Sequence, residues 1–177
     1  MAKHNRHIRG ETEEIDVPIN GRRAVDAGDL MFLDTQDGAG GLGESVTYTG
    51  IPFDLGQKAN DASAALVVLN LAYTNFLGIA METSPVGVTE FISIATAGVF
   101  RMPLTDLTGV TIGSKVCIAS PATAVNLSAD TVAGESSVGA SSAYLGWVTK
   151  SGASSQTYVE FELQTRSNRT FNVDTTV

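Results

Sequence analysis

Three pairs of acidic residues are the strongest candidates for acid–base chemistry in this chain. Two carboxylates held close together can act as general acid and general base. The pairs are Asp26 with Asp29, Asp34 with Asp37, and Glu160 with Glu162. The first two pairs flank predicted turns, where Asp commonly hydrogen-bonds nearby backbone. The third lies on the predicted solvent face of a strand, so we expect all three pairs to be structural.

Two features near residue 38 could hold a ligand. Asp34 and Asp37, beside Gly38, could bind Ca²⁺, but they lack the remaining ligands of an EF-hand loop. The segment 38–43 matches the G-x-G-x-x-G dinucleotide fingerprint, which requires a helix after its glycines. Residues 45–49 alternate like a strand instead, so a flexible hairpin loop explains the glycines better. We expect no cofactor and no metal ion.

The pairing of base and nucleophile that covalent catalysis needs is missing from the predicted core. Both histidines, His4 and His7, stand in a polar N-terminal segment, whereas a catalytic base must be held rigidly against its nucleophile. Cys117 is the single cysteine and lies in an apolar run, so we expect a buried core thiol without an internal disulfide. The sequence therefore predicts a protein that is not an enzyme.

Aromatic and basic side chains offer two binding features. Tyr144 and Trp147 could form an exposed platform for a carbohydrate, or they could be half-buried residues of a strand. Arg101 follows two apolar residues and could anchor a protein interface. A solvated charge at a strand end is the alternative for Arg101, and the sequence alone leaves both questions open.

Charge is distributed unevenly along the chain, whose net charge is −8. Lys3, Arg6 and Arg9 make the N-terminal segment basic, whereas residues 24–165 hold four basic and fourteen acidic residues. An acidic body repels phosphates, so we expect no nucleic-acid partner. No apolar run approaches the roughly 18 residues of a membrane span, and the first residues lack the apolar part of a secretory signal. A basic segment on an acidic body is typical of an electrostatic tether, or of a solvated tail.

An internal echo predicts that the chain consists of two related halves. Phe76–Ala80 returns 68 positions later as Tyr144–Val148, with a Leu-Gly pair at the same place in each copy. Upstream of each copy, a glycine precedes a strand-like stretch, at Gly28–Leu33 and at Gly113–Ile118. One small β architecture built twice explains this pattern.

Alternation of apolar and polar residues predicts where the strands lie. Ile15, Val17 and Ile19 predict a strand, and Pro18 assigns it to a sheet edge or to pairing with a neighbouring subunit, since proline donates no ladder hydrogen bond. Further strands are expected at 24–33 with a turn or bulge at Gly28-Asp29, and at 78–81 and 89–100 as a hairpin with a bulge or a close backbone approach at Gly98. Residues 110–113 lead into a strand at 113–118, and the last strands are expected at 145–150 and 157–163. Residues 61–76 favour a helix, with a buried strand at 64–71 as the alternative.

These elements predict a mainly β fold: a small β-barrel or sandwich of two related halves, with one short α-helix at about 61–76 and extended N- and C-terminal arms. We divide the chain into a flexible arm at 1–14, a β-barrel domain at 15–163 and a C-terminal tail at 164–177. Within the domain, the segment 119–143 is rich in Ala, Ser, Thr and Gly, so an exposed insertion loop or an irregular hairpin is expected there.

Five short stretches form a pattern that is found in a known family. They are Ala27–Leu30, Phe76–Ala80, Thr89–Phe100, Ile112–Val116 and Leu145–Val148. In this pattern, over about residues 15–163, the chain resembles the small β-barrel capsid decoration (cement) proteins of tailed bacteriophages. The long segment 119–143 and the charged arm depart from the shortest members of that family.

The resemblance implies a non-enzymatic virion protein, made in the host cytoplasm, that docks on the outside of an assembled capsid and reinforces it. The implied partners are the major capsid protein and further copies of the chain, as a homotrimer at or near three-fold positions. The expected capsid or subunit interface consists of Lys3, Arg6, Arg9, Ile15, Val17, Ile19 and Arg101. A carbohydrate-binding or adhesin module, or another accessory virion surface protein, is the alternative, and a glycosidase using carboxylates is a further rival.

Overall fold

Eleven strands and no helix make up the part of the chain that the computed structural model describes. The described residues are 6–9, 12–19, 21, 24–34, 49–52, 75–104, 110–118, 132–134, 144–150 and 158–165. The strands are β1 (Arg6–Arg9), β2 (Glu14–Pro18), β3 (Leu30–Asp34), β4 (Thr49–Pro52), β5 (Phe76–Ala80), β6 (Phe91–Ala95), β7 (Val99–Pro103), β8 (Lys115–Ile118), β9 (Val132–Gly134), β10 (Gly146–Lys150) and β11 (Tyr158–Leu163). The predicted mainly β fold is confirmed.

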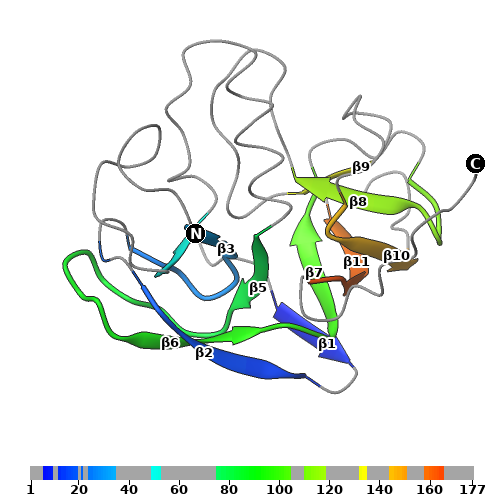
Figure 1. Cartoon of the computed structure of the whole chain (residues 1–177). Helices are drawn as coiled ribbons and strands as arrows, with labels where there is room; N and C mark the ends of the chain where they lie inside the picture. Colours follow the sequence, from blue (N-terminus) through cyan, green and yellow to red (C-terminus); the bar gives the residue numbers. More distant parts are fainter. Residues whose placement is uncertain are drawn as a thin grey trace, which may run out of the picture.

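The strands form two antiparallel sheets (Figure 1). The first sheet has five strands in the order β2-β6-β5-β3-β4, and the second has six in the order β1-β7-β11-β10-β8-β9. The chain passes from the first sheet to the second between β6 and β7, where Gly98 adopts a φ of 125° that favours glycine. The single strand predicted at 89–100 is therefore two strands in different sheets, and Gly98 belongs to the crossover rather than to a bulge.

The two sheets are built on one repeated plan, which confirms the two related halves. Strands β2 to β6 correspond in order to β7, β8, β9, β10 and β11, because each set occupies the same sequence of positions in its sheet. The register agrees as well: Met31 of β3 pairs with Gly78 of β5, and Val116 of β8 pairs with Gly146 of β10. The echoed Leu-Gly pairs thus occupy equivalent positions in the two sheets.

The first strands of the two halves, β2 and β7, are also equivalent, although their residue types are largely different. Pro18 at the end of β2 pairs with Phe91, and Pro103 at the end of β7 pairs with Tyr158. Among the described strands, β2 is the outermost of its sheet, so the edge position predicted from Pro18 is confirmed. β7 is not outermost, because β1 covers its outer edge.

Each half repeats one glycine turn down to its hydrogen bonds. The N–H of Gly28 donates to the carbonyl of Ala80 at 2.7 Å, and the N–H of Gly113 donates to the carbonyl of Val148 at 2.9 Å. The N–H of Ala80 in turn donates a hydrogen bond of 2.9 Å to the carbonyl of Asp29, the residue after the glycine. The N–H of Val148 donates an equivalent hydrogen bond of 2.9 Å to the carbonyl of Ser114. Both glycines have a positive φ, 97° at Gly28 and 86° at Gly113, so the echo in sequence reflects one backbone requirement met twice.

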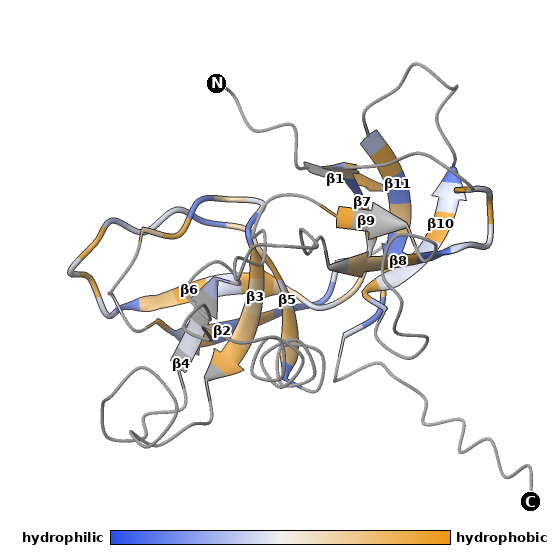
Figure 2. Ribbon diagram, turned by 90° about the horizontal axis from the view of Figure 1, so that it is seen from above, coloured by the Kyte–Doolittle hydropathy of each residue, from blue (hydrophilic) through white to orange (hydrophobic). Residues whose placement is uncertain are grey.

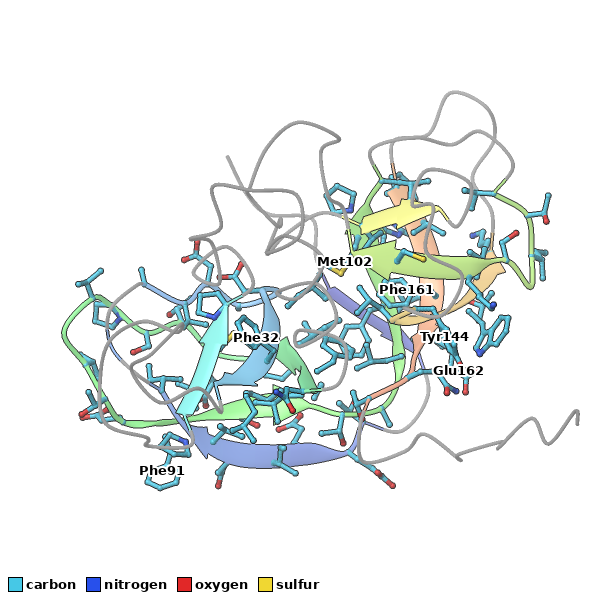
Figure 3. All side chains as sticks on the ribbon, turned by 45° about the horizontal axis from the view of Figure 1, so that its top comes forward. Phe32, Phe91, Met102, Tyr144, Phe161 and Glu162 are labelled. Atoms are coloured by element: carbon cyan, nitrogen blue, oxygen red, sulfur yellow. The ribbon has the colours of Figure 1, made fainter. Side chains whose placement is uncertain are left out.

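The buried apolar residues of the described part of the chain form two clusters. The larger cluster contains residues of both sheets, among them Phe32, Met102 and Phe161 (Figure 3). The smaller cluster packs against the first sheet: Val17, Ile19, Val25, Met31, Ala80, Ile92 and Ile94. Alternate residues of a strand face opposite sides, so β3 serves both clusters, and Figure 2 shows its apolar residues along the strand.

The N-terminal segment differs from the flexible arm expected at 1–14. Its residues Arg6–Arg9 form β1 and pair antiparallel with β7. Closer to β2, the carbonyl of Glu13 accepts a hydrogen bond of 2.7 Å from the N–H of Thr96. Backbone pairing with a neighbouring strand creates β1, and this requires no apolar pattern in the sequence.

The predicted insertion loop and helix have different outcomes. Within 119–143, the strand β9 pairs with β8, and its Val132 is fully buried, so this part is a hairpin strand and not an exposed loop. For the helix predicted at 61–76, residues 61–74 lie outside the described residues, and Phe76 opens β5. Over the described ranges, no helix has the length and hydrophobicity needed to span a membrane.

Candidate functional site

The described basic residues that were predicted for an interface lie in the first two strands of the second sheet, β1 and β7. Arg6 and Arg9 belong to β1, and Arg101 lies in β7 opposite Arg6. Lys3 lies outside the described residues. Arg6 and Arg101 are thus partners in the backbone register of two neighbouring strands.

The three apolar residues predicted for the same interface differ in how deeply they are buried. Ile15 is 39% exposed, whereas Val17 and Ile19 are 7% and 1% exposed and belong to the smaller core cluster. The alternation along β2 turns Val17 and Ile19 toward the interior of their own sheet. Their assignment to an interface is therefore corrected: these two side chains stabilise the fold, and only Ile15 is available to a partner.

Arg101 is held in a cluster of charged and aromatic side chains, which corrects the alternative of a solvated charge. Its guanidinium Nη2 donates to Oε1 of Glu160 in an ion pair, and the guanidinium carbon lies 4.6 Å from the centroid of the Tyr158 ring. Lys150 Nζ lies 3.9 Å from the same carboxylate oxygen. The hydrogen bond to Glu160 raises the pKa of Arg101 above its ordinary value, against the opposing effect of burial.

The predicted solvent position of Glu160 is wrong. Glu160 is only 5% exposed, whereas Glu162 on the same strand is exposed. A buried carboxylate is costly unless it is paired and hydrogen-bonded, and Arg101 provides that pairing. Glu160 therefore acts as the counterion of Arg101, and its environment differs from that of Glu162.

The remaining carboxylate pairs show turn chemistry where they are described. An Oδ atom of Asp29 accepts a hydrogen bond of 2.9 Å from the N–H of Asp26, which confirms the structural role expected for this pair. Asp37 lies outside the described residues, so the pair with Asp34 is not tested. Among the residues that the structure describes, no group of three His, Cys, Asp or Glu side chains is arranged to hold a metal ion.

Tyr144 and Trp147 form a tilted pair at the surface of the second sheet. Their ring centroids are 5.2 Å apart with an interplanar angle of 52°, and both residues are half-buried, as one of the two alternatives predicted. Lys115 Nζ lies 5.5 Å and 6.0 Å from the two centroids. The equivalent residues of the first half, Phe76 and Ile79, are buried in the larger cluster. Equivalent positions are therefore buried in the core in the first half, at Phe76 and Ile79, and lie at the surface in the second half, at Tyr144 and Trp147.

Sequence reasoning missed an acidic edge along β2. Glu13, Glu14 and Asp16 are all exposed there, and the Glu14 carboxylate accepts a hydrogen bond of 2.6 Å from the hydroxyl of Ser93. Phe91, at the end of the neighbouring strand, is 67% exposed, and its ring projects away from the ribbon (Figure 3). The available signal was the alternation of acidic with apolar residues in 13–17 beside a proline.

These residues define two unlike edges at the N-terminal end of the chain. One edge is β1, whose sequence is basic, and the other is β2, which is acidic and lies beside an exposed aromatic ring. Comparison of the chain with protein-family models, curated proteins and solved structures finds no match.

Proposed function

We propose that this protein is a structural component of a phage virion, which binds the outer surface of the assembled capsid and reinforces it. It acts without catalysis, and its partners are the major capsid protein and two further copies of itself. The proposal rests on the resemblance to capsid decoration proteins. One observation supports it. Gly78 and Gly146, which belong to the motifs of that resemblance, lie where neighbouring strands pack closely against each other in each half of the fold.

The importance of these glycines follows from the space around them. A Cβ atom added to Gly78 would lie 1.9 Å from the carbonyl oxygen of Ala95, and one added to Gly146 would lie 1.9 Å from that of Glu162. Real Cβ atoms do not approach a backbone oxygen so closely, so only glycine fits. A resemblance at these positions is therefore a resemblance in how the strands are packed.

The edges of the two sheets suit attachment to a large shell. An extended segment can add itself to an exposed strand, and main-chain hydrogen bonds then supply the affinity. β1 and β2 are such outermost strands, both formed by the first eighteen residues of the chain. In this proposal, the N-terminal segment contacts the shell or an adjacent subunit, and the rest of the domain stays outside the capsid.

Co-sedimentation with empty shells tests the proposal. Purified protein is mixed with undecorated capsids assembled from the major capsid protein of the same phage, the capsids are pelleted, and the pellet is imaged by cryo-electron microscopy. We expect saturable binding, with added density on the outer surface at or near the three-fold positions. Protein that stays in the supernatant at every ratio, or that pellets equally with an unrelated protein shell, refutes the proposal.

Two truncations test the part played by the N-terminal segment. Removing residues 1–14 deletes β1 together with Glu14, the first residue of β2, whereas removing residues 1–5 leaves both strands in place and serves as the matched control. We expect the longer deletion to weaken capsid binding or to change the oligomer mass, and the shorter one to have the smaller effect. Undiminished capsid binding together with an unchanged mass after the longer deletion removes this role.

A further inference from the structure

The repeated plan shows that an edge covered in one half is open in the other. β2 and β7 are equivalent strands, and the outer edge of β7 pairs with β1. Among the described strands, β2 forms a ladder only on its inner side, with β6, and just beyond its end Ile19 makes a single parallel bridge to Gly50 of β4. β1 in turn has an open outer edge within the described part of the second sheet, and both strands lie along the lower margin of Figure 1.

The hydrogen bonds of β2 show which residues its open edge presents. The carbonyl of Glu13 accepts from Thr96, and the N–H of Ile19 donates to the carbonyl of Glu90, so the odd-numbered residues of this strand face β6. In an antiparallel pair the residues between them direct their N–H and C=O groups away from the neighbour. The backbone N–H and C=O groups of Glu14 and Asp16 therefore point away from β6, and no other described strand forms a ladder with them, so they offer a template for one more strand.

Register confirms that these two residues occupy a strand-binding position. Asp16 pairs with Ser93 in the first sheet, and the equivalent pair in the second sheet is Arg101 with Glu160. Arg101 is also the residue of β7 that lies opposite Arg6 of β1. Asp16 therefore occupies in the first sheet the position that Arg101 occupies in the second. At this position Arg101 lies opposite β1, whereas no described strand forms a ladder with the outer edge at Asp16.

The chemistry of the open edge calls for a basic strand. Glu13, Glu14 and Asp16 are exposed along it, and no basic residue lies between positions 12 and 19. The exposed ring of Phe91 lies at its end, opposite Pro18. In the second half the equivalent aromatic residue, Tyr158, carries the guanidinium of Arg101 over its ring. Carboxylates and an exposed aromatic face both attract cations.

We propose that this edge pairs with β1 of a second copy of the chain, so that a sheet continues from one subunit into the next. β1 has the sequence Arg-His-Ile-Arg, and its charge complements that of β2. Contacts between two β1 edges or between two β2 edges set like charges against each other, so the favoured contact joins unlike edges. The inference concerns copies of this chain alone and does not depend on the proposed binding to a capsid.

Short strands and surface charges determine the character of the contact. β1 has four residues and β2 has five, so the ladder between them is short. Its attraction is screened by salt, because the Debye length falls from about 10 Å at 0.1 M to about 3 Å at 1 M ionic strength. Self-association should therefore rise with protein concentration and fall on addition of salt.

Charge-reversed variants test the contact by sedimentation velocity, over protein concentrations from about 1 μM to about 1 mM. The first variant carries Glu14→Arg with Asp16→Arg, and the second carries Arg6→Glu with Arg9→Glu. We expect the wild-type protein to self-associate and each variant alone to sediment as a smaller species. An equimolar mixture of the two variants should recover the wild-type sedimentation, because the reversed β2 of one complements the reversed β1 of the other.

A control variant separates this contact from a general effect of net charge. Glu162→Arg with Asp26→Arg changes the charge by as much as the β2 variant but lies away from its edge, and both residues are exposed. We expect this control to self-associate like the wild type. A wild-type protein that is monomeric throughout, a mixture that fails to recover the association, or a control that loses it as fully as the β2 variant overturns the proposal.

Discussion

Replacing the glycine of the second Leu-Gly motif by alanine should destabilise the protein strongly. At Gly146, an added Cβ would lie 1.9 Å from the carbonyl oxygen of Glu162 and 2.8 Å from a ring carbon of Phe161. The first of these contacts is with the backbone of the neighbouring strand, which cannot rotate aside as a side chain can. Strands β10 and β11 would therefore have to move apart, at the centre of the second sheet.

The magnitude follows from comparing two kinds of glycine in the same half. Forcing extra atoms into a packed site costs roughly 1–3 kcal/mol and occasionally more, and a backbone clash of this depth places Gly146→Ala at about 3 kcal/mol or above. Gly113 has a φ of 86° but nothing within 4 Å of an added Cβ. Gly113→Ala should therefore cost only the left-handed backbone, about 1–2 kcal/mol.

Urea denaturation of the two variants and the wild type measures this difference directly, as the change in midpoint at constant slope. Gly78→Ala is a third variant, because Gly78 has both the 1.9 Å contact and a φ of 149°. It should be the least stable of the three. The reasoning is refuted if Gly146→Ala costs no more than Gly113→Ala, since the close approach of the strands would then not be what the motif provides.

Three further predictions concern the side chains that the fold buries. Arg101→Met should lower stability by about 3 kcal/mol, because it leaves the buried Glu160 with only the exposed Lys150 ammonium, 3.9 Å away, as a counterion. Adding Glu160→Leu to this variant should restore most of the loss, and thermal denaturation that shows no restoration contradicts the ion-pair account. Asp29→Ala should lower the free energy of unfolding by about 1–3 kcal/mol, and by more than Ser114→Ala does. The reason is that a buried carboxylate accepts the backbone hydrogen bond of the first glycine turn, whereas a hydroxyl accepts that of the second. Equal urea midpoints of the two variants would argue against this. Cys117 is 2% exposed and should react with Ellman's reagent only as fast as the protein unfolds, so a prompt reaction of the native protein contradicts its burial.

Local patterns predicted much of this fold because their cause is local. Alternation along 15–19 and 157–163, and the turn residues between 81 and 89, are read directly from the chain, and the strands and hairpin expected there are present. The edge position of β2 followed from one property of Pro18, its missing N–H. The echo of the Leu-Gly pairs reflects a steric requirement at two equivalent places, and this is why it survives in the sequence.

Other features depend on partners that are distant in sequence. β1, β4 and β9 have three or four residues each and lack the alternation of a half-buried strand; they are strands because a neighbour offers its backbone. The burial of Glu160 depends on Arg101, 59 positions away. Pro18 indicated an edge strand, but which residues of β2 face outward depends on its pairing with β6, which is distant in sequence.

Two similar halves in one chain have a consequence for how the protein can change over evolution. A symmetric dimer of half-length chains carries every residue twice, so a substitution at one outer strand appears at the other as well. In the single chain, Asp16 and Arg101 occupy equivalent positions of the two halves and carry opposite charges. Ile79 and Trp147 also occupy equivalent positions, but Ile79 is buried in the core and Trp147 lies at the surface. Covalent duplication therefore allows each position to diverge independently of its twin, so that one copy can be selected for stability and the other for recognition.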